Sequence, residues 1–190
     1  DGTEMQLIYY VYMVLRGLGR FSFPAFCFLL VEGFYHTRSK AKYLRNMVIF
    51  MLVSEVPFDL AISGRMFDFA QQNVFFTLTM GFAEVWIADF LNQKASADSN
   101  RLLLYQILGI AAVLLIGFGA ELFHTDYGAV GVAVIYILYA MHRTPVHSAV
   151  FAWFILSIAN WLEIFCFPFI FAVMCYNGER GRQPKYFFYI

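Results

Sequence analysis

The chain has 190 residues, of which 61% are hydrophobic, 20% aromatic and only 14% charged. An ordinary soluble domain has about 25% charged residues, so this composition indicates an integral membrane protein. The 13 basic and 13 acidic side chains cancel, which leaves no net field to attract nucleic acid and makes the position of each charge informative. We expect an all-α, polytopic transmembrane helix bundle that forms a single domain over residues 1–190.

Several apolar stretches have the length of a membrane span, which needs roughly 20 predominantly apolar residues. The first runs from Leu7 to Phe34. The stretch from Ser148 to Tyr176 is long for one crossing and short for two, and Pro168 must interrupt a helix that contains it, so we favour two short spans there. About seven spans are predicted in total, the others being Leu44–Ile62, Val74–Leu91, Leu102–Leu122 and Gly128–Met141.

The two ends of the sequence resemble the interior of a longer protein. No basic region followed by an apolar core and a cleavage site precedes the first span, so no signal peptide is visible. The last residues, PKYFFYI, stop where another apolar helix begins. We therefore expect flanking helices beyond both ends.

The Lys/Arg bias of the short connections sets the orientation of the bundle. The connection His36–Arg45 is strongly basic, whereas those at 63–72 and 123–127 are neutral or acidic. We place the first in the cytoplasm and the other two outside. The remaining basic markers of the cytoplasmic side are Lys94, Arg101, His142, Arg143 and the tail residues Arg180, Arg182 and Lys185.

Motifs of soluble enzymes are absent from the sequence. It contains no GxSxG elbow, P-loop, HExxH motif or Rossmann glycine fingerprint, so nucleophilic, metal and nucleotide chemistry of those kinds is unsupported. Cys27, Cys166 and Cys175 lie inside apolar runs without CxxC spacing or histidine partners. We interpret them as small buried hydrophobic residues and expect no metal site.

A basic stripe follows the first span. Arg38, Lys42 and Arg45 stand at i, i+4 and i+7, so they share one helical face if a helix begins near Ser39. Such a stripe can hold phosphate groups. The alternative, which composition alone favours, is a juxtamembrane belt that fixes topology and touches anionic lipid.

A carboxylate and a histidine lie one helical turn apart beside that stripe. Glu32 can reach His36, orient its imidazole and raise its basicity, which would create a general base. The alternative is that both polar side chains merely extend toward the membrane surface.

Ionisable residues also occur inside the apolar runs. Arg16 and Arg20 share a face of the first span, and Pro24 cannot donate to the carbonyl of Arg20, which predicts a kink. An arginine at bilayer depth costs roughly 2.5 to 3.5 kcal/mol, so Arg20 needs a partner. Glu55 and Asp59 are the nearest candidates by depth, either for catalysis or as a structural ion pair between helices.

A polar stripe in the third span has two interpretations. Asn73, Thr77 and Glu84 stand at i, i+4 and i+11 and therefore line one side of an apolar helix. They can line a substrate tunnel or form hydrogen bonds between helices. Glu163, near Asn160, likewise needs a partner because of its depth.

The longest motifs resemble those of a known family. Six motifs closely resemble those of the TraX family of integral membrane proteins, in the same order and over nearly all of the chain. They are GRFSFPAFCFLLVEGFYHTRSKAKYLRN, then SEVPFDLA and QQNVFFTL, and later FHTDYGAVGV, CYNGERG and KYFFYI. The matched residues are Gly19, Arg20, Phe23, Pro24, Glu32, Gly33, His36, Thr37, Arg38, Tyr43, Arg45, Ser54, Glu55, Pro57, Phe58, Asp59, Asn73, Thr77, Asp126, Tyr127, Gly128, Asn177 and Gly178.

The resemblance implies a multi-pass acyltransferase of the bacterial inner membrane. It would move an acetyl group from cytoplasmic acetyl-CoA, a co-substrate, to an acceptor such as a pilin N-terminus or another envelope molecule. A histidine supported by a carboxylate would take the acceptor proton, and Arg20 or Asn73 would stabilise the oxyanion. The predicted catalytic set is His36, Glu32, Arg20, Glu55, Asp59 and Asn73, and the predicted CoA-binding set is Arg38, Lys42, Tyr43 and Arg45.

The sequence also departs from the family pattern. Family members usually begin with a helix that carries an Asp-His pair and end with a helix opened by Tyr-Pro near a histidine; neither is in this chain. If the principal catalytic histidine belongs to that first helix, His36 has a supporting role. The rival hypothesis is a non-catalytic membrane subunit that docks a partner of a secretion or conjugation system. A transporter ranks last because no internal repeat is visible.

Overall fold

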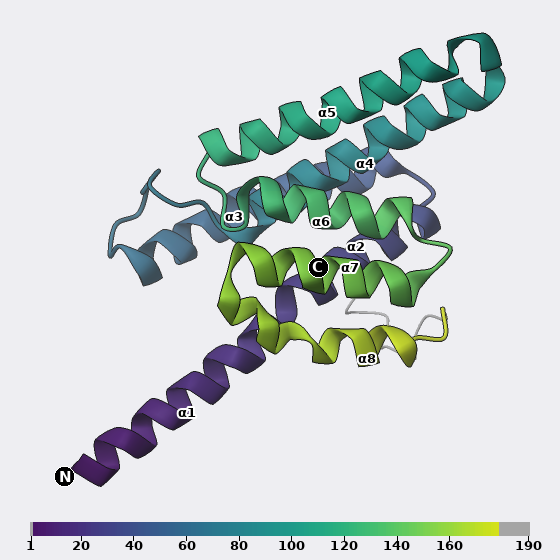
Figure 1. Cartoon of the computed structure of the whole chain (residues 1–190). Helices are drawn as coiled ribbons and strands as arrows, with labels where there is room; N and C mark the ends of the chain where they lie inside the picture. The colour runs from purple at the N-terminus through teal and green to yellow at the C-terminus, as the bar shows by residue number, and fades with distance from the viewer. Residues whose placement is uncertain (1, 179–190) are drawn as a thin grey trace.

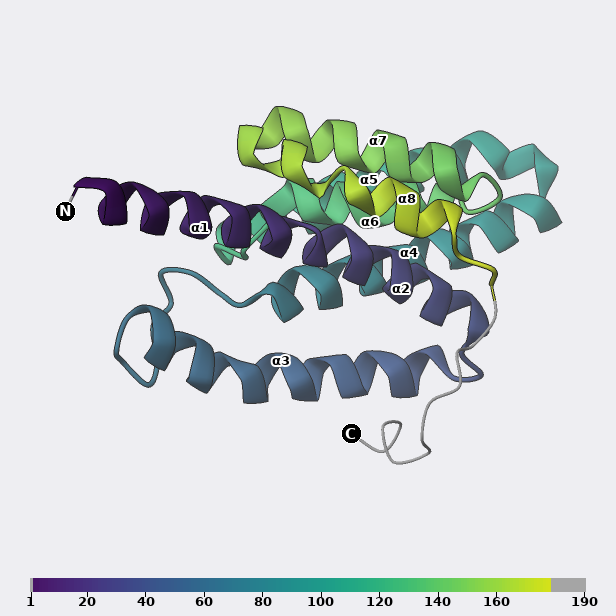
Figure 2. The same ribbon diagram turned by 90° about the horizontal axis from the view of Figure 1, so that it is seen from below.

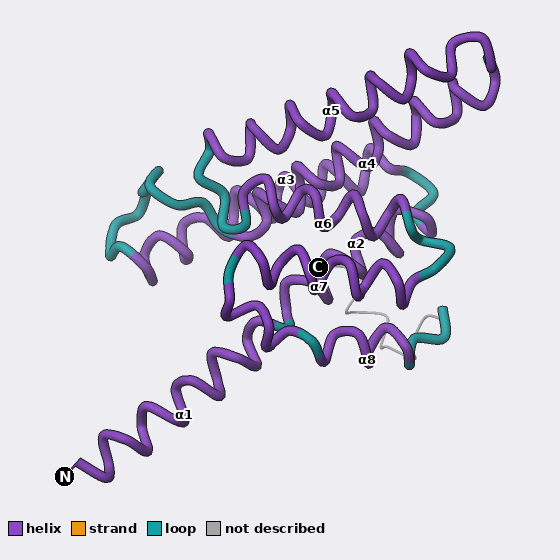
Figure 3. Tube along the Cα trace, viewed as in Figure 1, coloured by secondary structure: helices purple, strands orange, loops and turns teal. Residues whose placement is uncertain are grey.

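The computed structural model describes residues 2–178, and every regular element within them is a helix (Figures 1 and 3). This confirms the all-α prediction. The tail residues Arg180, Arg182 and Lys185 lie outside the described residues. The elements are α1 (Gly2–Arg20), α2 (Ser22–His36), α3 (Lys40–Ile62), α4 (Val74–Ala97), η1 (Ser99–Arg101), α5 (Leu102–Leu122), α6 (Gly128–Ala140), α7 (Pro145–Ala159), η2 (Trp161–Cys166) and α8 (Pro168–Met174).

Three stretches of the described residues are long and apolar enough to cross a membrane: Thr3–His36, Val74–Ala97 and Leu102–Leu122. Helix α3 has 23 residues but carries too many charges to qualify by composition. Helices α6 and α7 and the stretch Trp161–Met174 are shorter than a full crossing. Length and composition by themselves therefore support three of the roughly seven predicted spans.

The first span is interrupted where the proline predicts a kink. Helix α1 ends at Arg20 and α2 begins at Ser22, because Pro24 lacks the N–H that would bond to the Arg20 carbonyl. The amide of Ala25 instead donates to the carbonyl of Phe21, 3.3 Å away. Beyond this break α1 projects from the rest of the bundle (Figure 1).

The stretch from Ser148 to Tyr176 folds into two segments, as predicted. The chain reverses at Asn160, whose side-chain oxygen accepts a hydrogen bond from the amide of Leu162 at 3.0 Å and so caps η2. Pro168 opens α8, where its missing N–H needs no partner. Helices α7 and α8 consequently lie side by side (Figure 1).

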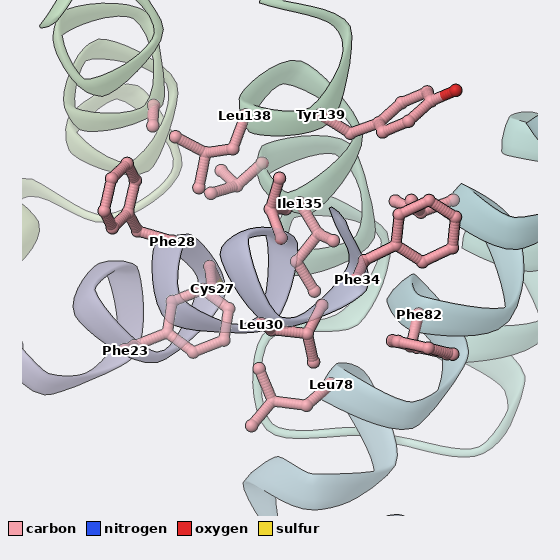
Figure 4. Packing of buried hydrophobic residues seen from close by; sticks show 14 of the residues in the cluster. Phe23, Cys27, Phe28, Leu30, Phe34, Leu78, Phe82, Ile135, Leu138 and Tyr139 are labelled. Carbon is pink, nitrogen blue, oxygen red and sulfur yellow. The ribbon is translucent and has the colours of Figure 1, made fainter. Parts of the chain in front are cut away.

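Helix α4 is the centre of the bundle and packs against α3, α5 and α6. Figure 2 shows α3 on the side of the molecule away from α7 and α8. The core forms where α2 meets α4 and α6, with Phe34 and Phe82 in contact at 5.5 Å between ring centroids (Figure 4). The last turns of α2 are thereby held against the interior of α4, which positions the polar residues at the end of α2.

Two glycines let α4 and α6 approach closely. A Cβ at Gly81 would lie 2.3 Å from Cδ1 of Ile135, and one at Gly131 would lie 2.4 Å from Cγ2 of Thr77. Small residues at such contacts are typical of helix packing in membranes, where dispersion contacts between helices supply much of the stability.

The change Gly131→Ala is therefore expected to lower the free energy of unfolding by about 1–3 kcal/mol, because the added methyl group overpacks the α4–α6 contact. Thermal unfolding of the protein in detergent would measure the effect. Gly109→Ala in α5 is the matched control, since nothing lies within 4 Å of a Cβ at that position. Equal melting temperatures for the two variants would contradict the close approach.

Candidate functional site

The carboxylate of Glu32, in the last turn of α2, is the centre of a polar cluster at the predicted cytoplasmic end. Its Oε1 lies 2.8 Å from Nε2 of His142, in the connection between α6 and α7. Its Oε2 accepts a hydrogen bond from the hydroxyl of Tyr176, just after α8, at 3.2 Å. The Glu32 side chain is 12% exposed. One carboxylate thus links three separate parts of the chain.

His142 is oriented on two sides. Because Nε2 faces the Glu32 carboxylate, that nitrogen carries the donated proton and Nδ1 has the free lone pair. The ring of Tyr35 lies against the imidazole with centroids 4.0 Å apart. The Tyr35 hydroxyl in turn donates to the carbonyl of Tyr139 at 3.4 Å. Since the His142 side chain is still 32% exposed, a substrate can reach its free nitrogen.

Tyr176 serves as a donor in this cluster. Burial, and then the neighbouring charge of Glu32, raises the pKa of the Tyr176 hydroxyl. The phenol therefore stays protonated near neutral pH and donates to the carboxylate.

His36 occupies a more exposed position than His142. Its Nδ1 lies 2.8 Å from the Glu32 backbone carbonyl and 3.8 Å from the Glu32 carboxylate, and its side chain is 66% exposed. The predicted Glu32–His36 proximity is present, but the shorter carboxylate contact belongs to His142.

A second polar group adjoins the cluster. Lys40, at the start of α3, forms a 2.7 Å ion pair with Asp89 of α4, and the hydroxyl of Tyr139 donates to Asp89 at 3.4 Å. Because Tyr139 also accepts the bond from Tyr35, this group connects the basic segment to the His142 side of the cluster.

The basic residues of the stripe are exposed. Helix α3 begins at Lys40 with Ser39 as its N-cap, so Lys42 and Arg45 share a helical face while Arg38 precedes the helix. Within residues 2–178 none of these three forms an ion pair with a carboxylate. Their charges are therefore available to a ligand.

Tyr43, predicted to contact CoA, packs into the protein. Its ring stacks on Phe82 with centroids 4.7 Å apart, and its hydroxyl oxygen would lie 2.8 Å from a Cβ at Gly33. It also lines a 340 Å³ cavity between α2, α3 and α4 together with Asn46.

The prediction that Arg20 pairs with Glu55 or Asp59 is wrong. The Arg20 guanidinium bonds to Glu163 of η2 at 2.6 Å, and not to Glu55 or Asp59. The Glu163 side chain is 2% exposed and that of Arg20 is 23% exposed, so the pair satisfies two charges that the bilayer rejects. The reversal of the chain at Asn160 brings Glu163 to α1, a long-range contact that depth alone does not predict.

Glu55 and Asp59 hold the outer connection between α3 and α4. Glu55 accepts hydrogen bonds from the side-chain amide of Asn73 and, at 3.3 Å, from its backbone N–H. Asn73 also caps α4 by accepting from the amide of Phe75 at 2.9 Å. Buried Asp59 accepts from the amide of Asp68 at 2.8 Å. All three side chains thus have structural partners.

Glu84 stands apart from both groups. It is fully buried on α4, and neither of its carboxylate oxygens has a partner among the described residues. Thr77, on the same stripe, accepts a bond from the amide of Tyr127 at 3.4 Å, which favours the interhelical interpretation of that part of the stripe.

The six predicted catalytic residues therefore lie in three separate places. Glu32 and His36 lie at one end of α2, whereas Arg20 precedes its other end, about 18 Å away at 1.5 Å per residue. Glu55, Asp59 and Asn73 lie around the outer connection. Sequence reasoning missed His142 and Tyr176 as site residues, because their contacts with Glu32 span more than 100 positions; the cytoplasmic location of His142 was the available signal.

Comparisons with known proteins agree with this membrane architecture. A sequence model of the family described as "TraX protein" matches residues 2–190. A relative from Dichelobacter nodosus, the probable fimbrial assembly protein FimC of serogroup H1, is 31% identical, with 94% of this chain and 78% of the relative covered. No solved structure matches the chain.

Proposed function

This chain belongs to the TraX family, and from that premise we propose that it is a membrane acyltransferase that uses acyl-CoA from the cytoplasm. The observation that carries the proposal is the Glu32–His142 contact of 2.8 Å. A carboxylate that fixes one imidazole nitrogen leaves the other as a general base, which is the arrangement that acyl transfer needs.

The reaction follows from that geometry. Nδ1 of His142 takes a proton from the acceptor amine or hydroxyl as the acceptor atom attacks the thioester carbonyl carbon. The carbon–sulfur bond breaks, the acyl group stays on the acceptor, and the proton passes to the departing CoA sulfur. Glu32 stabilises the imidazolium that exists between these two proton transfers. Arg20 and Asn73, at the other end of the bundle, take no part in this version of the mechanism.

The unpaired cations beside the cluster fit the phosphates of CoA. Arg38 follows His36 by two residues, and Arg45 and Lys42 lie on the next helix. Guanidinium groups suit phosphate because they offer several N–H donors in one plane. The acceptor belongs to the cell envelope in this proposal, and the membrane is the bacterial inner membrane, because the basic connections face the compartment that supplies CoA.

The double change Arg38→Gln and Arg45→Gln is expected to raise the KM for acetyl-CoA about 100-fold with little change in kcat. Each lost charge-assisted hydrogen bond costs about 1.5 kcal/mol or more, and a factor of ten corresponds to about 1.4 kcal/mol. Transfer of labelled acetate from acetyl-CoA by the purified protein provides the measurement.

The matched control is Arg101→Gln, since Arg101 is a cytoplasmic arginine paired with Asp98 at 3.5 Å away from the cluster. An unchanged KM in the double variant would remove the phosphate-binding assignment. Absence of any acetyl-CoA binding by the intact wild-type protein would remove the acyltransferase proposal itself.

The second candidate is a non-catalytic assembly subunit, which the name of the Dichelobacter nodosus relative favours. In that role the chain would bind a partner protein and would need neither acyl-CoA nor a general base. It differs in one measurable way: Glu32→Gln and the double arginine variant would both insert and support fimbrial assembly normally.

A further inference from the structure

An apolar groove runs along α2 and α8 and ends at the Glu32 cluster. Its walls include Phe28 and Leu29 of α2 and Phe169 and Ala172 of α8, and its volume is about 260 Å³. Both helices can be followed in Figure 2. Phe28 and Phe169 are almost fully buried, so the floor of the groove belongs to the packed core.

A second apolar cavity lies next to the groove. Phe21 lines both this groove and that second cavity of about 620 Å³ between α1 and the segment 165–168. Side chains that line the second cavity include Met13, Val14 and Phe165.

The polar boundary of the groove is Tyr176. This residue lines the groove, and its hydroxyl donates to Glu32, which in turn contacts His142. A ligand whose hydrocarbon fills the groove would thus present its polar end to the same acid–base pair. This is the arrangement expected for a molecule that reacts at the head of a chain.

The size of the groove exceeds what an acetyl group requires. A water molecule, which is close to a methyl group in size, takes about 30 Å³ of liquid. An acetyl methyl group would therefore occupy only a small part of the 260 Å³ groove.

We propose that the groove binds the hydrocarbon chain of an acyl-CoA donor longer than acetyl-CoA, with its thioester at Glu32 and His142. The inference rests on the proposed function and names its donor class. The bonds that change are those already described: the acyl carbon leaves the CoA sulfur for the acceptor, and the acceptor proton ends on that sulfur.

Charge distinguishes this occupant from a membrane phospholipid. A phospholipid chain in the groove would place its phosphate near the Glu32 carboxylate, which repels it. A thioester is uncharged, and the phosphates of CoA are separated from it by the pantetheine arm, so they can reach the unpaired cations Arg38, Lys42 and Arg45.

The test is a chain-length series measured with the purified protein in nanodiscs, using acetyl-, butyryl-, hexanoyl- and octanoyl-CoA, with binding to empty nanodiscs subtracted. Each two additional buried methylene groups are expected to tighten binding roughly tenfold. Ala172→Phe, which fills the groove, should remove that gain in affinity with chain length. Ala111→Phe, on the exposed face of α5, is the matched control and should behave like wild type.

Several outcomes overturn the inference while the proposed function stands: equal affinities along the wild-type series, an equal loss of chain-length preference in both phenylalanine variants, or a phospholipid retained on the protein and displaced by Ala172→Phe. The wild-type series decides the matter even if Ala172→Phe does not fold. Failure of the wild-type protein to bind any of the four thioesters defeats the proposed function as well.

Discussion

Exchange of Glu32 for glutamine is expected to lower acyl transfer by about 10²- to 10⁴-fold, the usual contribution of general acid–base catalysis. Glutamine keeps the size of the side chain but can no longer stabilise a protonated His142, and its amide group can turn the imidazole to the wrong tautomer. Single-turnover transfer from labelled acetyl-CoA measures this step. The loss should appear in kcat, with little effect on acyl-CoA binding, because the missing interaction strengthens in the transition state.

Two histidine variants separate the residues that contact Glu32. His142→Ala should lose as much activity as Glu32→Gln, and combining the two changes should cost little more, because the residues act as one unit. His36→Ala should lose less, since its nitrogen is 3.8 Å from the carboxylate. The reverse ranking would make His36 the base, as the one-turn spacing of Glu32 and His36 suggested.

The change Arg20→Met is expected to destabilise the protein by about 3–5 kcal/mol, because it leaves the buried Glu163 carboxylate without its 2.6 Å partner. Replacement of both residues by methionine should recover most of this loss, since no charge then remains in the apolar surroundings. Unfolding of the four proteins in detergent, followed by circular dichroism, completes the double-mutant cycle.

Arg65→Met supplies the control for that cycle, because Arg65 is an exposed arginine in the outer connection. If the effects of Arg20→Met and Glu163→Met on the free energy of unfolding are additive, Arg20 and Glu163 do not interact. A double variant that remains stable but loses acyl transfer would instead give the pair a catalytic role, which its distance from Glu32 argues against.

Local sequence was sufficient for most of the helices. The predicted bounds of Leu102–Leu122 equal those of α5, and the break at Pro24 and the helix boundary at Pro168 occur where they were predicted. These features depend on neighbours within a few residues: apolar runs of spanning length, a missing proline N–H, and side chains such as Ser39 that cap the next helix.

The pairing of the polar residues could not be predicted from the sequence. The expected depth in the membrane predicted that Arg20 would pair with Glu55 or Asp59. In the fold Arg20 pairs with Glu163 instead, because η2 packs against α1. Likewise spacing paired Glu32 with His36, one turn away, whereas the close contact is made by His142, 110 positions further along the chain.

By itself, then, the sequence determined that this protein is a helical membrane bundle with a basic connection after its first apolar stretch, because bilayer insertion and helix formation depend on local composition. Only the tertiary structure decided which charges neutralise one another and which stay free. Those contacts depend on which face each helix turns toward its neighbours and on the reversal of the chain at Asn160. Both depend on packing between segments distant in sequence, such as the close approach at Gly131.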